Sequence, residues 1–173
     1  MRAMGPGSVS SLLKIAMDVV WVVLLIGIAV LGLAALAVLF VPIPEDLTVE
    51  IGSGSATLTR WLAFAALLMF AGYIAILGLV VGRVRRIFAT LTAGDPFHPA
   101  NVTRLRQIGI GLAALEGANL LIPILLLLAA PDADFNAGVN FDLTAWFSVL
   151  VVFVMAEVFR EGARLRREAE LTI

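Results

Sequence analysis

The chain of 173 residues has no cysteine and a single histidine, His98. The lack of cysteine excludes disulfides, thiolate metal sites and cysteine nucleophiles, and one histidine cannot supply both axial ligands of a haem. Charged residues are scarce as well: they make up 14% of the chain, against about a quarter in an average soluble domain. The sequence also lacks a Ser/His/Asp set, a phosphate-binding glycine loop and a cluster of metal ligands. We therefore expect no enzyme activity, no cofactor and no metal.

What the sequence has in abundance is apolar residues, which make up 61% of the chain and gather in four long runs. A helix rises about 1.5 Å per residue, so each run can cross a hydrocarbon core of about 30 Å, although the last is barely long enough. The sequence therefore predicts an all-α membrane protein, a single domain over residues 1–173 built as a four-transmembrane-helix bundle. The predicted spans are residues 19–41, 61–81, 108–130 and 143–158.

The charges between the runs alternate in sign. Eleven of the twelve Lys and Arg residues lie before the first run, between the second and third, or after the fourth, and the other two connectors are acidic. Short loops rich in Lys and Arg stay on the cytoplasmic side of a membrane. Both termini, the connector 83–106 and the tail 159–173 are therefore predicted to be cytoplasmic.

Turn-forming residues mark where the predicted helices begin and end. Ser10 or Ser11 could cap the first helix, and Pro42 and Pro44 would end it. Gly94 is a typical residue to end the second helix after it has continued past the membrane.

The third and fourth helices are also expected to extend beyond their spans. His98 and Pro99 read as the N-cap and first residue of the third helix, and Pro123 inside it predicts a kink. The fourth helix is expected to run to about Ala169. Its tail carries ion pairs at four-residue spacing, Arg164 with Glu168 and Arg166 with Glu170.

Two short stretches on the outer side alternate apolar and polar residues, which is typical of strands. They are Leu47–Ile51 and Val139–Leu143. The two stretches could pair as a short outer β-ribbon, or both could be irregular loops, since an isolated two-stranded ribbon is marginally stable.

The sequences of the connector, GDPFHPANVTRLR at 94–106, and of the tail, AEVFREGARL at 156–165 with ELTI at 170–173, are distinctive. Together they resemble a family of small bacterial four-span membrane proteins catalogued as domain of unknown function 2975, and the resemblance covers essentially the whole chain. It implies a multi-pass protein of the bacterial cytoplasmic (inner) membrane. Members of that family are often encoded beside a small helix-turn-helix regulator, which implies a membrane protein that holds or signals to a cytoplasmic DNA-binding partner.

One acidic residue, Glu116, lies near the middle of the third run, with Asn119 one turn further along. A carboxyl group at that depth is costly to ionise and could carry a proton or a cationic substrate. The other interpretation is structural: a protonated Glu116 hydrogen-bonded to Asn119 and to a neighbouring helix, linking the helices together.

Small residues recur at four-residue spacing in the second and third runs. Such rows let helix backbones approach closely, so we expect them to pack helix against helix. The rows are Gly78 with Gly82, and Gly109 with Ala113 and Gly117.

Acidic residues at the inner ends of the first and fourth spans, Asp18 and Glu157, are expected to pair with nearby arginines of the connector and tail. Ion pairs of this kind are ordinary at the ends of membrane helices, so we assign them a structural role.

Apolar residues among the charges of the connector and tail either pack on each other or form a joint surface that docks a partner. Direct contact with nucleic acid is not expected, because acidic residues interleave the basic ones. The candidate partner surface consists of Asp95, Pro96, Phe97, Asn101, Arg104, Arg106, Phe159, Arg160, Gly162, Arg164 and Leu165.

Three functions follow from these features. The favoured one is a non-catalytic integral membrane protein, in contact with the lipid bilayer, that acts as an interaction or regulatory subunit and binds another protein through the connector and tail. The second is a small proton-linked transporter or sensor that uses Glu116. The third is an accessory subunit of a larger membrane complex.

Overall fold

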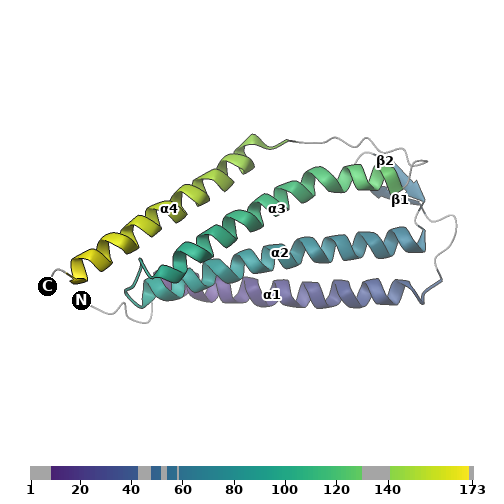
Figure 1. The fold of residues 1–173 in the computed structure, drawn as a ribbon. Coiled ribbons are helices and arrows are strands. Elements are labelled where there is room, and N and C mark those ends of the chain that lie inside the picture. Colours follow the sequence, from purple (N-terminus) through teal and green to yellow (C-terminus); the bar gives the residue numbers. More distant parts are fainter. Residues whose placement is uncertain (1–8, 43–47, 52–53, 58, 130–140, 172–173) are drawn as a thin grey trace.

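The computed structural model describes residues 9–42, 48–51, 54–57, 59–129 and 141–171. In this part of the chain, four helices and a small hairpin follow one another (Figure 1). Each helix holds a stretch long and apolar enough to cross a membrane, so the predicted membrane helices are confirmed. The helices are α1 (Val9–Val38), α2 (Arg60–Thr92), α3 (Pro99–Ala129) and α4 (Leu143–Leu171), and the strands are β1 (Thr48–Ile51) and β2 (Gly54–Thr57).

The start of α1 differs from the prediction, whereas its end agrees with it. The helix begins at Val9, so Ser10 and Ser11 lie inside it and do not cap it. It ends at Val38, before either proline, because the chain tightens there: the Leu39 amide donates to the Leu36 carbonyl at 3.2 Å. Pro42 follows within about a turn of Val38, and its ring would clash with the Val38 carbonyl if the helix continued, so the helix ends where this proline predicts; Pro44 lies outside the described residues.

The turn between α2 and α3 follows the prediction closely. Helix α2 runs to Thr92, and Gly94 has a φ of 82°, the left-handed conformation in which glycine commonly ends a helix. Helix α3 begins at Pro99, and Nδ1 of His98 accepts a hydrogen bond from the Ala100 amide at 3.1 Å. His98 thus caps the helix, as its position before a proline predicts.

The last two helices also extend as predicted. Figure 1 shows α3 changing direction along its length, and the proline inside it, Pro123, accounts for the bend because it removes a backbone donor. Helix α4 begins where Asp142 Oδ1 accepts hydrogen bonds from the amides of Thr144 at 2.8 Å and Ala145 at 3.2 Å. It continues to Leu171, well past its apolar stretch.

The hairpin corrects the predicted β-ribbon. Strand β1 falls within the first predicted stretch, but it pairs antiparallel with β2, which follows two residues later, with Ile51 opposite Gly54. Residues 141–142 of the second stretch are not in a strand, and Val139 and Asn140 lie outside the described residues. A two-residue connection closes far more easily than a loop across the whole molecule, so the local pairing is favoured.

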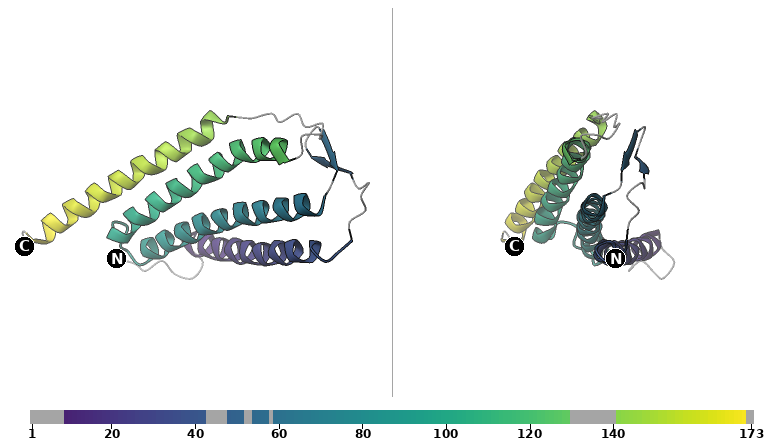
Figure 2. Two further views of the ribbon diagram at one scale, coloured as in Figure 1. Left: turned by 45° about the vertical axis from the view of Figure 1, so that its right-hand side comes forward. Right: turned by 90° about the vertical axis from the view of Figure 1, so that its right-hand side faces the viewer.

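The four helices form an open, curved row, which corrects the prediction of a bundle. Among the described residues, α1 contacts α2, α2 contacts α3 and α3 contacts α4, and α4 does not return to α1 (Figure 2). A cluster of buried residues lies between α2 and α3 and contains Val80, Ile87 and Ile108. Apolar side chains in a membrane gain little by leaving lipid for one another, so the sequence does not require the row to close.

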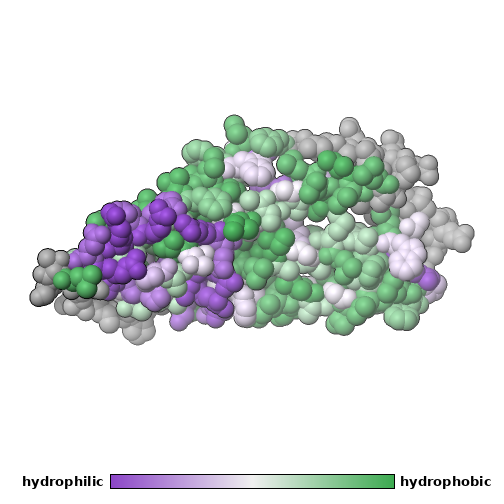
Figure 3. All heavy atoms as spheres, in the orientation of Figure 1, coloured by the Kyte–Doolittle hydropathy of each residue, from purple (hydrophilic) through white to green (hydrophobic). Residues whose placement is uncertain are grey.

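Polar residues gather at one end of the row. This is the end at which α1 begins and α4 ends, and Figure 3 shows its hydrophilic surface beside the largely apolar remainder of that face. We call it the basic end, defined by residues 9–18, 82–106 and 157–171. The opposite end carries the β1–β2 hairpin.

Candidate functional site

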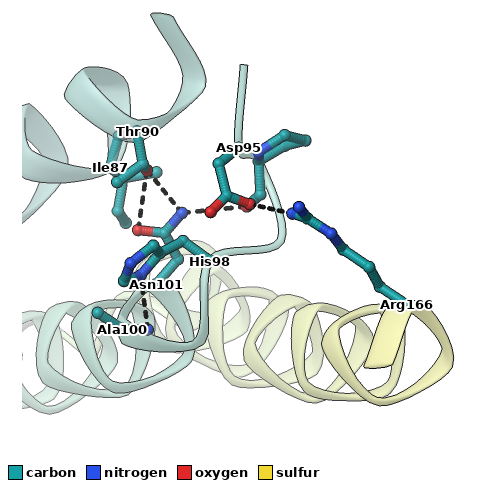
Figure 4. A network of polar contacts seen from close by, with 8 residues as sticks. Ile87, Thr90, Asp95, His98, Ala100, Asn101 and Arg166 are labelled. Atoms are coloured by element: carbon teal, nitrogen blue, oxygen red, sulfur yellow. Dashed lines mark hydrogen bonds and ion pairs between the residues drawn. The ribbon is translucent and has the colours of Figure 1, made fainter. Parts of the chain in front are cut away.

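At the basic end, a fully buried asparagine holds the α2–α3 turn together (Figure 4). The side chain of Asn101 has an exposed fraction of 0%. Its Nδ2 donates to Thr90 Oγ1 at 2.7 Å and to the Pro96 carbonyl at 3.0 Å, and Thr90 Oγ1 in turn donates to the Ile87 carbonyl at 2.7 Å. The end of α2, the turn and the start of α3 are therefore tied to one side chain.

Arg104 extends this network back to α2. Its Nη1 donates to Asn101 Oδ1 at 2.8 Å and to the Arg86 carbonyl at 3.1 Å. Asn101 thus has hydrogen-bond partners for both its donor and its acceptor, which is what a buried amide needs if it is to contribute stability. The network therefore fixes the position of the backbone at this turn.

The tail packs against this turn through an aromatic contact. The rings of Phe97 and Phe159 have centroids 5.6 Å apart and are tilted by 50°. Phe97 also lies against α4 at Gly162, where an added Cβ would come within 2.6 Å of the ring atoms Cδ1 and Cε1. Ala156 and Ala163, on the same helix, are buried with exposed fractions of 1% and 5%. Small residues on α4 therefore allow the turn to approach closely.

Two sets of ion pairs add to this contact. Asp95 of the turn pairs with Arg166 of α4, as Figure 4 shows. Nearer the membrane, Glu157 pairs with Arg106 of α3 at 2.9 Å and with Arg160 at 2.7 Å. Arg166 was expected to pair with Glu170, whose side chain is outside the described part. We call this whole contact, residues 94–106 against 156–166, the connector–tail joint.

The predicted partner surface is thereby divided. Most of its members lie within the joint, where they contact one another; this is the first of the two alternatives, mutual packing. The members that face outward on α4 are Arg160, Arg164 and Leu165, with Leu165 at an exposed fraction of 55%. Arg164 pairs with Glu161 at 2.5 Å and with Glu168 at 3.7 Å, the latter as predicted.

On the other side of the basic end, α1 is attached to α2. Asp18 pairs with Arg85, as expected for an acid at the end of the first span, and the Arg85 guanidinium lies 4.9 Å from the ring centroid of Trp21. A Cβ on Gly82 would come within 3.2 Å of Trp21 Nε1. The contact between Trp21 and Arg85 was not apparent from the sequence, because the two residues are far apart in the chain and no local motif pairs them.

The glycine rows lie at different interfaces. Added Cβ atoms would meet Leu24 and Ile28 of α1 at Gly78, and Phe153 of α4 at 3.0 Å from Gly109. Ala113 is half-buried, and nothing lies within 4 Å of a Cβ on Gly117.

The rows of small residues at four-residue spacing do not include the closest glycine contact within the membrane-spanning part. It is Gly111, where a Cβ would be 2.5 Å from Val80 Cγ2 of α2. Gly111 does not belong to either row of small residues, so the spacing carried no signal for it.

The two polar residues of the third span are three residues apart on α3, so they start from neighbouring parts of its surface. Glu116 is half-buried and follows Gly109 by two turns, which places it on the face that packs against α4. Asn119 is exposed and lines a groove between α2 and α3. Within the described part of the chain no hydrogen bond joins them, so the predicted Glu116–Asn119 link is not formed. Among the described residues, no group of three or more potential metal ligands comes together.

Comparison with known proteins places the connector and tail within one family. The family described as "Protein of unknown function (DUF2975)" matches residues 39–173, which include α2, α3, α4 and the whole connector–tail joint. No curated protein and no solved structure matches the chain.

Proposed function

The chain belongs to the DUF2975 family of proteins of unknown function, and we propose that it is a non-catalytic membrane protein whose basic end binds a protein partner. The observation that carries this proposal is the connector–tail joint. Its polar groups are engaged with one another, and it holds the last turns of α4 beyond the apolar part of the helix row. These last turns carry charges and lie beyond the apolar run 143–158, so they are not needed to span the membrane, which favours a role in recognition.

The binding surface in this proposal is the outward face of α4. Leu165 is exposed there, and its neighbours on this face are Arg164, Glu161 and Glu168, with Arg164 paired to both acids. An apolar side chain beside paired charges of both signs suits a partner that presents a hydrophobic contact within a polar surface. Residues inside the joint, such as Phe97 and Gly162, act indirectly by holding α4 in place.

We further propose that the basic end is cytoplasmic and that the membrane is the bacterial inner membrane. The support is the distribution of arginine: the connector and tail hold nine of the twelve basic residues. On this orientation the partner is a cytoplasmic protein, and a helix-turn-helix regulator is one candidate.

The experiment is isolation of the protein from its own membranes in mild detergent, followed by identification of the proteins that accompany it. Leu165→Asp should remove a stoichiometric soluble partner without changing the yield of the membrane protein. Leu91→Asp is the matched control, because Leu91 is an exposed leucine at the same end but on α2. A protein isolated alone, or a partner retained by Leu165→Asp, contradicts the proposal. Accompanying membrane proteins in place of a soluble one would favour the accessory-subunit alternative.

A second candidate function uses Glu116. The supporting observation is that this half-buried acid in the middle of a span has no hydrogen-bond partner among the described residues, and an acidic residue at that depth is a candidate functional group. In proteoliposomes with a pH-sensitive dye inside, Glu116→Gln should abolish any proton flux that the protein supports, and Glu161→Gln in the tail should not. Equal flux in Glu116→Gln and the unaltered protein contradicts this function.

A further inference from the structure

A groove of about 300 Å³ lies between α2 and α3 near the basic end, separate from the groove that Asn119 lines. Its surface is polar in part, and the two polar side chains among its lining residues are those of Arg83 and Gln107. The other lining residues are small or apolar: Ile76, Leu79, Val80, Ile110, Gly111 and Ala114.

The polar and apolar parts of this groove lie at different depths in the membrane. Arg83 follows the second apolar run, 61–81, by two residues, and Gln107 immediately precedes the third, 108–130. Both residues therefore lie at the boundary of the hydrocarbon core. Ile76 and Ala114 lie seven residues further into the same helices, about 10 Å deeper at the rise of an α-helix. The groove thus leads from a cation at the membrane surface into the apolar interior.

Two further arginines continue the boundary between α2 and α3 beyond the groove. Arg86 lies one turn past Arg83 on α2, and Arg104 lies one turn before Gln107 on α3. Nη1 of Arg104 donates to the Arg86 carbonyl at 3.1 Å, which brings these two positions together. Three arginines therefore follow one another along this helix boundary.

None of these three arginines forms an ion pair within the described part of the chain. The acids at the basic end whose side chains are described pair with other arginines: Asp18 with Arg85, Asp95 with Arg166, Glu157 with Arg106 and Arg160, and both Glu161 and Glu168 with Arg164. The mouth of the groove therefore has a positive charge that the described acids do not offset.

The charge and the depth of the groove together restrict the ligand. Guanidinium groups form strong, charge-assisted hydrogen bonds with phosphate, and an apolar groove suits the first part of an acyl chain. Basic pockets between membrane helices hold the headgroups of lipids that carry more than one phosphate. A free phosphate ion would leave the apolar part uncovered, and a zwitterionic phospholipid would bring a cation of its own toward the arginines.

We propose that this groove binds one anionic phospholipid that carries two phosphate groups. Arg83 and Gln107 hold the first phosphate at the mouth of the groove. Arg86 and Arg104 hold the second phosphate, and one acyl chain lies along the apolar lining toward Ala114. The site does not include the outward face of α4, so it is independent of the partner binding proposed above.

The test is native mass spectrometry of the detergent-solubilised protein, titrated either with tetraoleoyl cardiolipin, which carries two phosphates, or with dioleoylphosphatidylcholine. We expect one cardiolipin per chain, bound at least about tenfold more tightly than phosphatidylcholine. Arg83→Gln should weaken cardiolipin binding by about tenfold, the loss expected when a hydrogen bond to a charged group is removed. Ala114→Trp should also weaken it, because the larger side chain fills the apolar part of the groove.

The matched control is Arg167→Gln, which removes one positive charge from the same end of the molecule but on α4. It should leave cardiolipin binding within about twofold. Helix content and elution volume confirm that each variant is folded. Equal binding by Arg83→Gln and Arg167→Gln overturns the proposal, since it would show attraction by the charge of the whole end. Equal affinity for the two lipids also overturns it, as does displacement of cardiolipin by excess inorganic phosphate, which would show that phosphate alone is bound.

Discussion

Phe97 and Gly162 meet so closely that a single added methyl group at Gly162 would lie 2.6 Å from two carbon atoms of the Phe97 ring. Real side chains essentially never approach to that distance, so either the ring or the helix must move if the glycine is replaced. Phe97 belongs to the turn between α2 and α3, and Gly162 belongs to the tail. Their contact therefore determines where the last turns of α4 lie.

Gly162→Ala is accordingly expected to loosen the tail, at a cost of about 1–3 kcal/mol for the overpacked contact. The measurement is the rate at which trypsin cleaves at the arginines of the tail, which should rise severalfold. Gly117→Ala is the control, since nothing lies within 4 Å of a Cβ there and alanine is the better helix former. Cleavage that is no faster in Gly162→Ala than in Gly117→Ala would show that the close contact does not hold the tail.

Asn101→Ala is expected to destabilise the α2–α3 turn by about 2 kcal/mol or more, because it leaves buried polar groups without partners. Asn101→Asp should be similarly harmful, since a carboxylate cannot donate to the Pro96 carbonyl. The measurement is the midpoint of thermal unfolding in detergent. Thr103→Ala, at an exposed position on the same turn of α3, should leave the midpoint unchanged. Equal midpoints for the two alanine variants would contradict the structural role of Asn101.

The ion pair between Asp95 and Arg166 is expected to contribute little by itself. Its side chains have exposed fractions of 33% and 49%, and exposed pairs contribute up to about 1 kcal/mol. A double-mutant cycle with Asp95→Ala and Arg166→Ala, read from hydrogen exchange of the tail amides, should give a coupling energy in that range. The coupling should shrink as salt is added. A large coupling that is insensitive to salt would mean that the pair is shielded from water.

The orientation can be tested directly, because the chain has no cysteine of its own. A cysteine introduced by Arg167→Cys at the basic end should react with a membrane-impermeant maleimide only after the cells are permeabilised. One introduced by Arg60→Cys, at the start of α2 near the hairpin, should react in intact cells. The unaltered protein provides the background. The reverse pattern would place the basic end outside.

Local chemistry made several features predictable. The positive φ of Gly94, the cap formed by His98 and the start of α3 at Pro99 depend on residues next to one another in the chain, so the sequence shows them directly. The first alternating stretch does contain a strand, but neither alternative offered for it included β2 as its partner, because alternation indicates a strand and not the strand beside it.

The candidate site was predictable in composition but not in geometry. The sequence shows the motifs around Phe97 and Gly162. It does not show which of their residues pack against one another and which face outward on α4. A hydrogen bond between Glu116 and Asn119 was one of two alternatives that their helical spacing offered, but none joins them among the described residues. A helix that is apolar on all sides carries no periodic pattern to show which face meets which neighbour.

The number of spans, their lengths and the separation of basic from acidic connectors are properties of contiguous residues, and the amino-acid sequence determines them because hydrophobic transfer and charge act residue by residue. The open row of helices, the approach of Phe97 to Gly162 and the groove beside Asn119 arise only in the tertiary structure. They depend on close packing between residues far apart in the chain, where a difference of one methyl group decides whether two helices can meet.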